Sequence, residues 1–293
     1  MTTPATPPPL PQAPRAPYQQ PPQGWEGGSG GLYASPIPVR SPGLGDAIAS
    51  EWTKIRSVRS TLWTLGVMIV LLLAVGLLAA FAVSASDADL DGTPVLSLGF
   101  FGVLLGSICV ITLGVLTIAS EYGTGMIRTT LTACPSRVRM LVAKSIVFFL
   151  LSFTITTVTT GIVGLLQTAM VDGGTPTADD WLRSTVGVGL YVATLGLLSL
   201  ALGALIRHSA GAITIMIAVV LLPLVLAMFM FSPSLADLQQ ALFEYSIPNQ
   251  LGTLYDASMT TSGPSGWEPL WIILGVTAVT MAGAFVSLDR RDV

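Results

Sequence analysis

Six long stretches of this sequence contain no Asp, Glu, Lys or Arg: 60–86, 92–120, 145–171, 184–206, 208–236 and 269–288. Each can hold the roughly 20 apolar residues with which an α-helix crosses about 30 Å of hydrocarbon. The stretches are continuously apolar, whereas strands of a membrane barrel alternate apolar and polar residues. They therefore predict an all-α integral membrane protein with six transmembrane helices, at Leu62–Val83, Val95–Ala119, Val142–Val171, Ser184–Ile206, Ala210–Phe231 and Pro269–Leu288.

The scarcity of charge supports this fold class. Charged residues make up only 10% of the chain, and its mean hydropathy is +0.73, whereas soluble domains carry about 25% charged residues. The first span follows a segment much longer than the charged region of a signal peptide, so we expect it to be retained. Cys109 and Cys134 are expected at different depths, which predicts no disulfide between them.

The distribution of cations predicts the orientation. Twelve of the thirteen Lys and Arg residues precede the first span, lie between spans two and three or four and five, or follow span six. Only Arg183 falls on the other side. By the positive-inside rule the twelve are cytoplasmic. We therefore expect a multi-pass protein of the plasma (inner) membrane with both termini in the cytoplasm. The net charge of −3 gives no indication of a nucleic-acid partner.

Two segments precede the six-helix domain, which we place at 62–293. Residues 1–43 are rich in Pro, Gly and Gln and predict a disordered cytoplasmic tail. Residues 44–61 have an apolar face of helical period, with Asp46 as the expected N-cap. They predict an amphipathic interfacial helix along the inner leaflet. Its aromatic ring at headgroup depth would be that of Trp52, and the cations facing anionic lipid would be Lys54, Arg56 and Arg59. A helix that simply continues the first span inward is the alternative.

A charged loop, Glu121 to Lys144, separates the second and third predicted spans. Glu121 ends a helix, where its charge opposes the helix dipole, so it needs a cationic partner: Arg128, Arg137 or an external group. Gly125 allows the chain to turn, and a short amphipathic helix follows, with Leu131 on its apolar side. Pro135 ends that helix, and the chain then enters the third span through Arg137, Arg139 and Lys144.

The order Glu121, Gly125, Arg128, Leu131, Pro135, Ser136, Arg137 and Lys144 resembles the cytoplasmic loop of type-2 ABC transporter permeases. The segment SEWTKIRSVRSTLWTL resembles the approach segment of the same family. One departure is Gly-Met-Ile-Arg, from Gly125, where the family more often has Gly-Thr. The resemblance extends over about Asp46 to Val293 through the six-span layout.

The resemblance implies a membrane dimer, formed with a second copy or a paralogue. It also implies a separate cytoplasmic ABC ATPase that binds ATP-Mg and docks on the loop, whose expected ATPase-coupling residues are Glu121, Gly125, Arg128, Leu131, Pro135, Arg137, Arg139 and Lys144. Between spans five and six it implies short helices that dip into the outer leaflet. Export of an apolar or amphipathic compound, such as a lipid, peptide or drug, is likewise an implication of the resemblance.

The chain itself lacks the residues for ATP hydrolysis. A phosphate-binding loop needs Gly-Lys-Ser/Thr, but Lys54 follows Thr53 and Lys144 follows Ala143. With one histidine, His208, we expect no catalytic residue, no metal site and no cofactor in this chain. Two other functions remain open: an ion-coupled secondary transporter, which usually has charged residues inside its spans, and a non-transporting membrane scaffold. The sequence identifies no substrate-binding residue.

Overall fold

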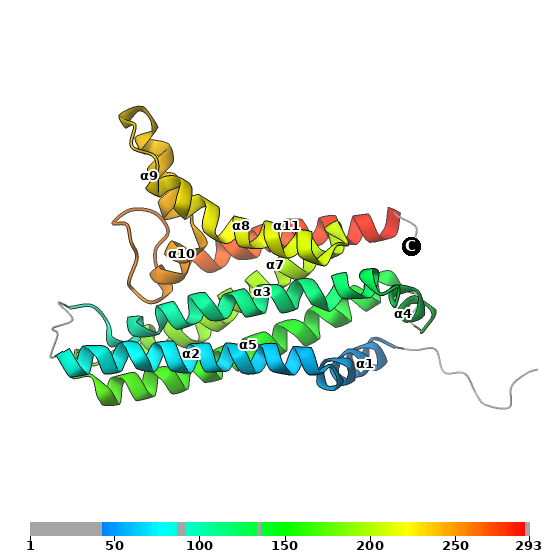
Figure 1. The fold of residues 1–293 in the computed structure, drawn as a ribbon, viewed down its shortest axis with the longest axis horizontal. Coiled ribbons are helices and arrows are strands. Elements are labelled where there is room, and N and C mark those ends of the chain that lie inside the picture. Colours follow the sequence, from blue (N-terminus) through cyan, green and yellow to red (C-terminus); the bar gives the residue numbers. More distant parts are fainter. Residues whose placement is uncertain (1–42, 87–91, 134–135, 291–293) are drawn as a thin grey trace, which may run out of the picture. The chain divides into compact units, whose positions relative to one another are not determined.

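The computed structural model describes residues 43–86, 92–133 and 136–290 (Figure 1), and within these ranges the chain is helical, with no β-strand. The predicted tail lies almost wholly outside the described residues. Among these described residues, six helical runs are long and apolar enough to cross a membrane, which confirms the predicted fold class: Arg59–Ser86, Val95–Gly123, Arg137–Met170, Ala178–Ile206, Ser209–Met228 and Glu268–Arg290.

The described elements are α1 (Leu44–Ser57), α2 (Arg59–Ser86), η1 (Val95–Gly99), α3 (Phe100–Gly123), α4 (Ile127–Ala133), α5 (Arg137–Met170), α6 (Ala178–Leu182), η2 (Arg183–Gly187), α7 (Val188–Ile206), α8 (Ser209–Met228), η3 (Pro233–Leu235), α9 (Ala236–Glu244), α10 (Ile247–Leu254) and α11 (Glu268–Arg290). Several spans extend beyond their predicted ends. The third begins at Arg137, because Ser136 caps the helix by accepting the Arg139 N–H.

The segment before the first span differs from the prediction in two ways. Gly43, not Asp46, is the N-cap of α1, and the Asp46 carboxylate accepts the Gly43 N–H at 2.8 Å. The predicted helix over 44–61 ends at Ser57, because Val58 is extended, and α2 starts at Arg59. This break means that α1 is not a straight continuation of α2. It instead packs mainly against α5.

α7 lies at the centre of the packing. Its contacts with α3, α5 and α11 are more extensive than those it makes with any other element, and most of its side chains are buried. Its packing against α3 depends on glycine: a Cβ atom added to Gly114 would lie 2.5 Å from the carbonyl oxygen of Gly196. Small residues let membrane helices approach this closely, so this crossing holds α3 and α7 together.

Two short helices, α9 and α10, connect α8 to α11. Figure 1 shows them at the opposite end of the helices from α1 and α4. Pro248 lies in the first turn of α10. A proline fits there because the first N–H groups of a helix have no intrahelical partner. Leu238 and Tyr245 remain exposed on α9 and just after it.

Candidate functional site

Four charged side chains from three helices meet in one cluster, which we call the four-charge cluster: Glu51 and Lys54 of α1, Glu121 of α3 and Lys144 of α5. The Lys144 ammonium nitrogen lies 2.8 Å from Oε2 of Glu51 and 2.6 Å from Oε1 of Glu121. Lys54 also forms an ion pair with Glu121 and lies 3.4 Å from Oε1 of Glu51. Each carboxylate therefore contacts both ammonium groups.

The cluster is buried. Lys144 is 1% exposed, Glu121 3% and Glu51 6%. Buried charges are stable only when they are paired, and removing one partner of a buried pair typically costs about 3–5 kcal/mol. The two acids and two bases balance, so the cluster carries no net charge. It therefore links α1, α3 and α5 at the ends that lie next to α4.

The partners of Glu121 correct the sequence-based expectation. Arg128 and Arg137 were expected to compensate this carboxylate, but Lys54 and Lys144 do so. Lys144 enters from the neighbouring helix at the level where α3 ends, and its charge offsets the unfavourable interaction between Glu121 and the helix dipole. Oε2 of Glu121 is buried and accepts no hydrogen bond within the described residues.

Lys54 also departs from its expected place. It was predicted to face anionic lipid, but its side chain turns toward Glu121 and is only 30% exposed. Burial disfavours its charge, yet the hydrogen bond to Glu121 and the nearby Glu51 carboxylate outweigh this, so the pKa of Lys54 lies above its ordinary value. Trp52, Arg56 and Arg59 are exposed. Their contact with lipid stays a prediction.

The predicted short helix of the loop is present as α4. Gly125 precedes it with a φ of 73°, a left-handed conformation that suits glycine. Within α4, Ile127 is buried, Leu131 is half-buried and Arg128 is exposed. Pro135 lies outside the described residues. Among the predicted coupling residues, Arg128 is therefore the exposed cation of α4 that another protein could contact.

The remaining loop cations contact the protein itself. Arg137 Nη1 donates a hydrogen bond to the carbonyl oxygen of Leu288, at 2.7 Å, near the end of α11. Arg139 is half-buried. Arg207, between α7 and α8, lies over the Tyr122 ring with its guanidinium carbon 4.9 Å from the ring centroid. These contacts connect the ends of α3, α5, α7 and α11 beside the cluster.

Two hollows flank the four-charge cluster. One, of about 350 Å³, lies between α1, α4 and α5 and is lined by residues that include Ser50, Thr130 and Met140. The other, of about 320 Å³, lies between α1, α2 and α3 and is rich in hydroxyl groups, including those of Thr61 and Thr117.

Sequence reasoning missed Glu51. Its signal was an acid three residues before Lys54, within reach on one helical turn.

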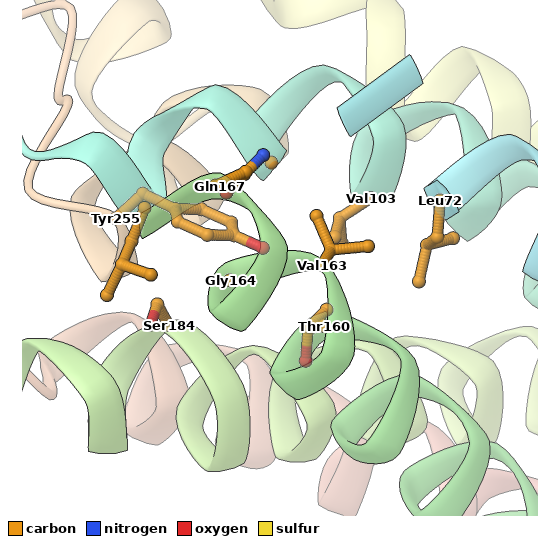
Figure 2. Close-up of a pocket in the computed structure, with 10 residues that line it drawn as sticks. Leu72, Val103, Thr160, Val163, Gly164, Gln167, Ser184 and Tyr255 are labelled. Atoms are coloured by element: carbon orange, nitrogen blue, oxygen red, sulfur yellow. The ribbon is translucent and has the colours of Figure 1, made fainter. Parts of the chain in front are cut away.

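A small polar cavity lies at the other end of the spans (Figure 2). Its volume is about 10 Å³, roughly the room that one water needs. Figure 2 shows the Tyr255 hydroxyl pointing into it, with Gln167 to one side and Ser184 and Thr160 across from it. The Gln167 amide donates to the Gly76 carbonyl oxygen at 3.1 Å. This hydrogen bond therefore joins α5 to α2. The cavity itself is too small for a substrate.

The site lies within the part of the chain that matches a known protein family. Residues 47–229 match the model of the family described as ABC-2 family transporter protein. This chain belongs to the ABC-2 transporter family. All four residues of the four-charge cluster lie within the matched range. No curated protein matches the chain. As an ABC-2 family protein, the chain is a multi-pass membrane subunit of an ABC transporter, and the family implies an ABC ATPase as its partner.

Proposed function

We propose that this ABC-2 subunit exports an apolar or amphipathic compound, using energy from a separate cytoplasmic ATPase that binds ATP-Mg. Both termini would lie in the cytoplasm, and the subunit would work with a second copy or a paralogue in the plasma membrane. The observation that supports this best is the four-charge cluster, because it connects the helices on either side of α4.

The cluster provides a way to transmit force. The ATPase would press on α4 through the exposed Arg128, and the neighbouring α1 would be displaced with it. Lys144 is paired with both Glu51 and Glu121. Separating these buried charges would cost several kcal/mol, so α1, α3 and α5 would move as one unit. Because α3 is tightly packed on α7, the motion would reach the centre of the bundle.

Charge reversal at Arg128 tests this proposal. In a complex with the ATPase that co-purifies with the chain, Arg128→Glu should abolish substrate-stimulated ATP hydrolysis and transport. Because Arg128 is exposed, the temperature of thermal unfolding should not change. Arg290→Glu, an exposed cation at the end of α11, serves as the matched control and should retain activity.

Two results would overturn the proposal. One is unchanged transport and ATPase binding in Arg128→Glu. The other is transport by the normal protein in ATP-depleted vesicles, driven by an ion gradient, as the ion-coupled alternative predicts.

A further inference from the structure

An apolar groove runs along α7 and α11. Its volume is about 600 Å³, within the range of sites that hold drug-sized ligands. Phe149 of α5, Leu190 of α7 and Leu274 of α11 are among its lining residues, none of which is charged. Its two threonines are already occupied: Thr194 donates to the Leu190 carbonyl, and Thr277 to the Thr194 carbonyl. The groove therefore suits a hydrocarbon tail.

A second hollow, of about 560 Å³, adjoins the start of α11. Trp271 lines both this hollow and the groove, so the two share one wall. The second hollow is different in character, because two carboxylates, Glu244 and Glu268, and the ring of Tyr245 also line it. Neither Lys, Arg nor His is among its lining residues. An apolar groove and an acidic, aromatic hollow thus meet at Trp271.

The two carboxylates carry uncompensated charge. Glu244 accepts hydrogen bonds from the hydroxyl of Ser262 and, at 2.8 Å, from the amide of Gln240. These bonds hold the pKa of Glu244 below its ordinary value, so it is ionised at neutral pH. Glu268 accepts the Ser265 N–H at 2.8 Å. Within the part of the chain that the structure describes, neither carboxylate has an ion-pair partner.

We propose that the groove and the hollow together bind an amphiphilic cation dissolved in the membrane. Its apolar tail lies in the groove between α7 and α11, and its ammonium headgroup lies in the hollow with Glu244 and Glu268. Trp271, which is 72% exposed, offers its ring face to the cation. This proposal rests on the proposed export function and narrows the substrate to this chemical class.

Charge complementarity favours this occupant over a zwitterionic bilayer lipid. A zwitterionic phospholipid headgroup would bring its phosphate, as well as its ammonium, close to two carboxylates, and no Lys, Arg or His is among the described residues that line the hollow. Like charges without a counter-charge repel each other, most strongly where water is partly excluded. A single cationic headgroup avoids this repulsion and neutralises the existing charge.

The test measures binding to the full chain in nanodiscs of zwitterionic lipid, without ATP or ATPase. Three probes share a twelve-carbon tail: radiolabelled dodecyltrimethylammonium, dodecylphosphocholine and dodecyl sulfate. The cation should bind at least about tenfold more tightly than the other two. Glu268→Gln should weaken cation binding about fivefold, the effect of a partly exposed charge pair, and should not weaken binding of the other two probes.

Two variants examine the tail and the specificity of the charge. Ala278→Phe places a ring in the groove and should remove the gain in affinity from an eight-carbon to a twelve-carbon tail. Asp237→Asn removes an exposed acid of α9 that does not line the hollow, and cation binding should not change. Thermal unfolding of each variant checks that it is folded.

Equal affinity for the three headgroups would overturn the inference and indicate occupation by bilayer lipid. Unchanged cation binding in both Glu268→Gln and Ala278→Phe would overturn it as well. These outcomes are separate from a failure of the proposed function, because binding is measured without the ATPase. If Arg128→Glu left transport intact while the cation bound as described, only the coupling proposal would fail.

Discussion

The ammonium nitrogen of Lys144 lies 2.6 Å from Oε1 of Glu121, although the two residues are 23 positions apart in the chain. Both side chains are almost fully buried. The loop between them therefore begins and ends on one buried ion pair. This arrangement holds the ends of α3 and α5 together while α4 remains accessible between them.

Removing Lys144 should destabilise the fold. Lys144→Met leaves Glu51 and Glu121 buried with only Lys54 as a partner, and we expect a loss of about 3–5 kcal/mol in the free energy of unfolding. Adding Glu121→Gln to Lys144→Met should recover part of the loss, since it removes the uncompensated charge. Denaturation in micelles measures both, with Arg128→Met as the exposed control. Equal stability of Lys144→Met and Arg128→Met would contradict the role of the cluster.

The turn before α4 should depend on glycine. Gly125 has a φ of 73°, and a side chain in this conformation costs about 1–2 kcal/mol. Gly125→Ala should increase hydrogen exchange at the amides of α4 and weaken coupling to the ATPase. Gly123→Ala is the matched control, because Gly123 has no atom within 4 Å of an added Cβ. If the two variants exchange alike, the turn does not position α4.

The crossing of α3 and α7 should not accept a methyl group. A Cβ atom on Gly114 would lie 2.5 Å from a backbone oxygen of Gly196, so Gly114→Ala must push the helices apart and should lose about 1–3 kcal/mol. Gly161→Ala adds the same methyl group where nothing lies within 4 Å, and should be neutral or slightly stabilising. Comparison of their unfolding temperatures decides the point.

Stability at alkaline pH should depend on Lys54. Its pKa is raised above the ordinary 10.5, so its contribution is complete below that pH and is lost as the pH rises through the folded-state value. Thermal unfolding measured from about pH 8 to 11.5 should show this loss in the normal protein. Lys54→Met should lack that part of the decline. Parallel curves for the two proteins would show that Lys54 is not stabilised by its neighbours.

The orientation can be tested with single cysteines. Thr129 of α4 and Met259, between α10 and α11, are both exposed. In a background without Cys109 and Cys134, an impermeant maleimide should label Met259→Cys in intact cells and Thr129→Cys only after permeabilisation. The reverse pattern would place α4 outside the cell and would contradict its docking to a cytoplasmic ATPase.

Patterns of apolar residues predicted the six spans because a lipid-crossing helix must satisfy its backbone internally and must avoid charge. Their ends were less predictable. The fourth run starts at Ala178 rather than Ser184, because Thr177 and Asp180 form a capping box in the polar region before the apolar stretch. Composition marks where hydrocarbon begins, whereas capping hydrogen bonds decide where a helix begins.

The sequence alone determined that this chain is a helical membrane protein and that charged residues concentrate beside α4, because both follow from local composition. Only the tertiary structure decided which of those charges are paired with each other. Glu51 and Lys144 are 93 residues apart, and their contact exists because α1 bends away from α2 at Val58 and packs on α5. Pairing across such a separation depends on where helices pack, and residue spacing along one helix cannot reveal it.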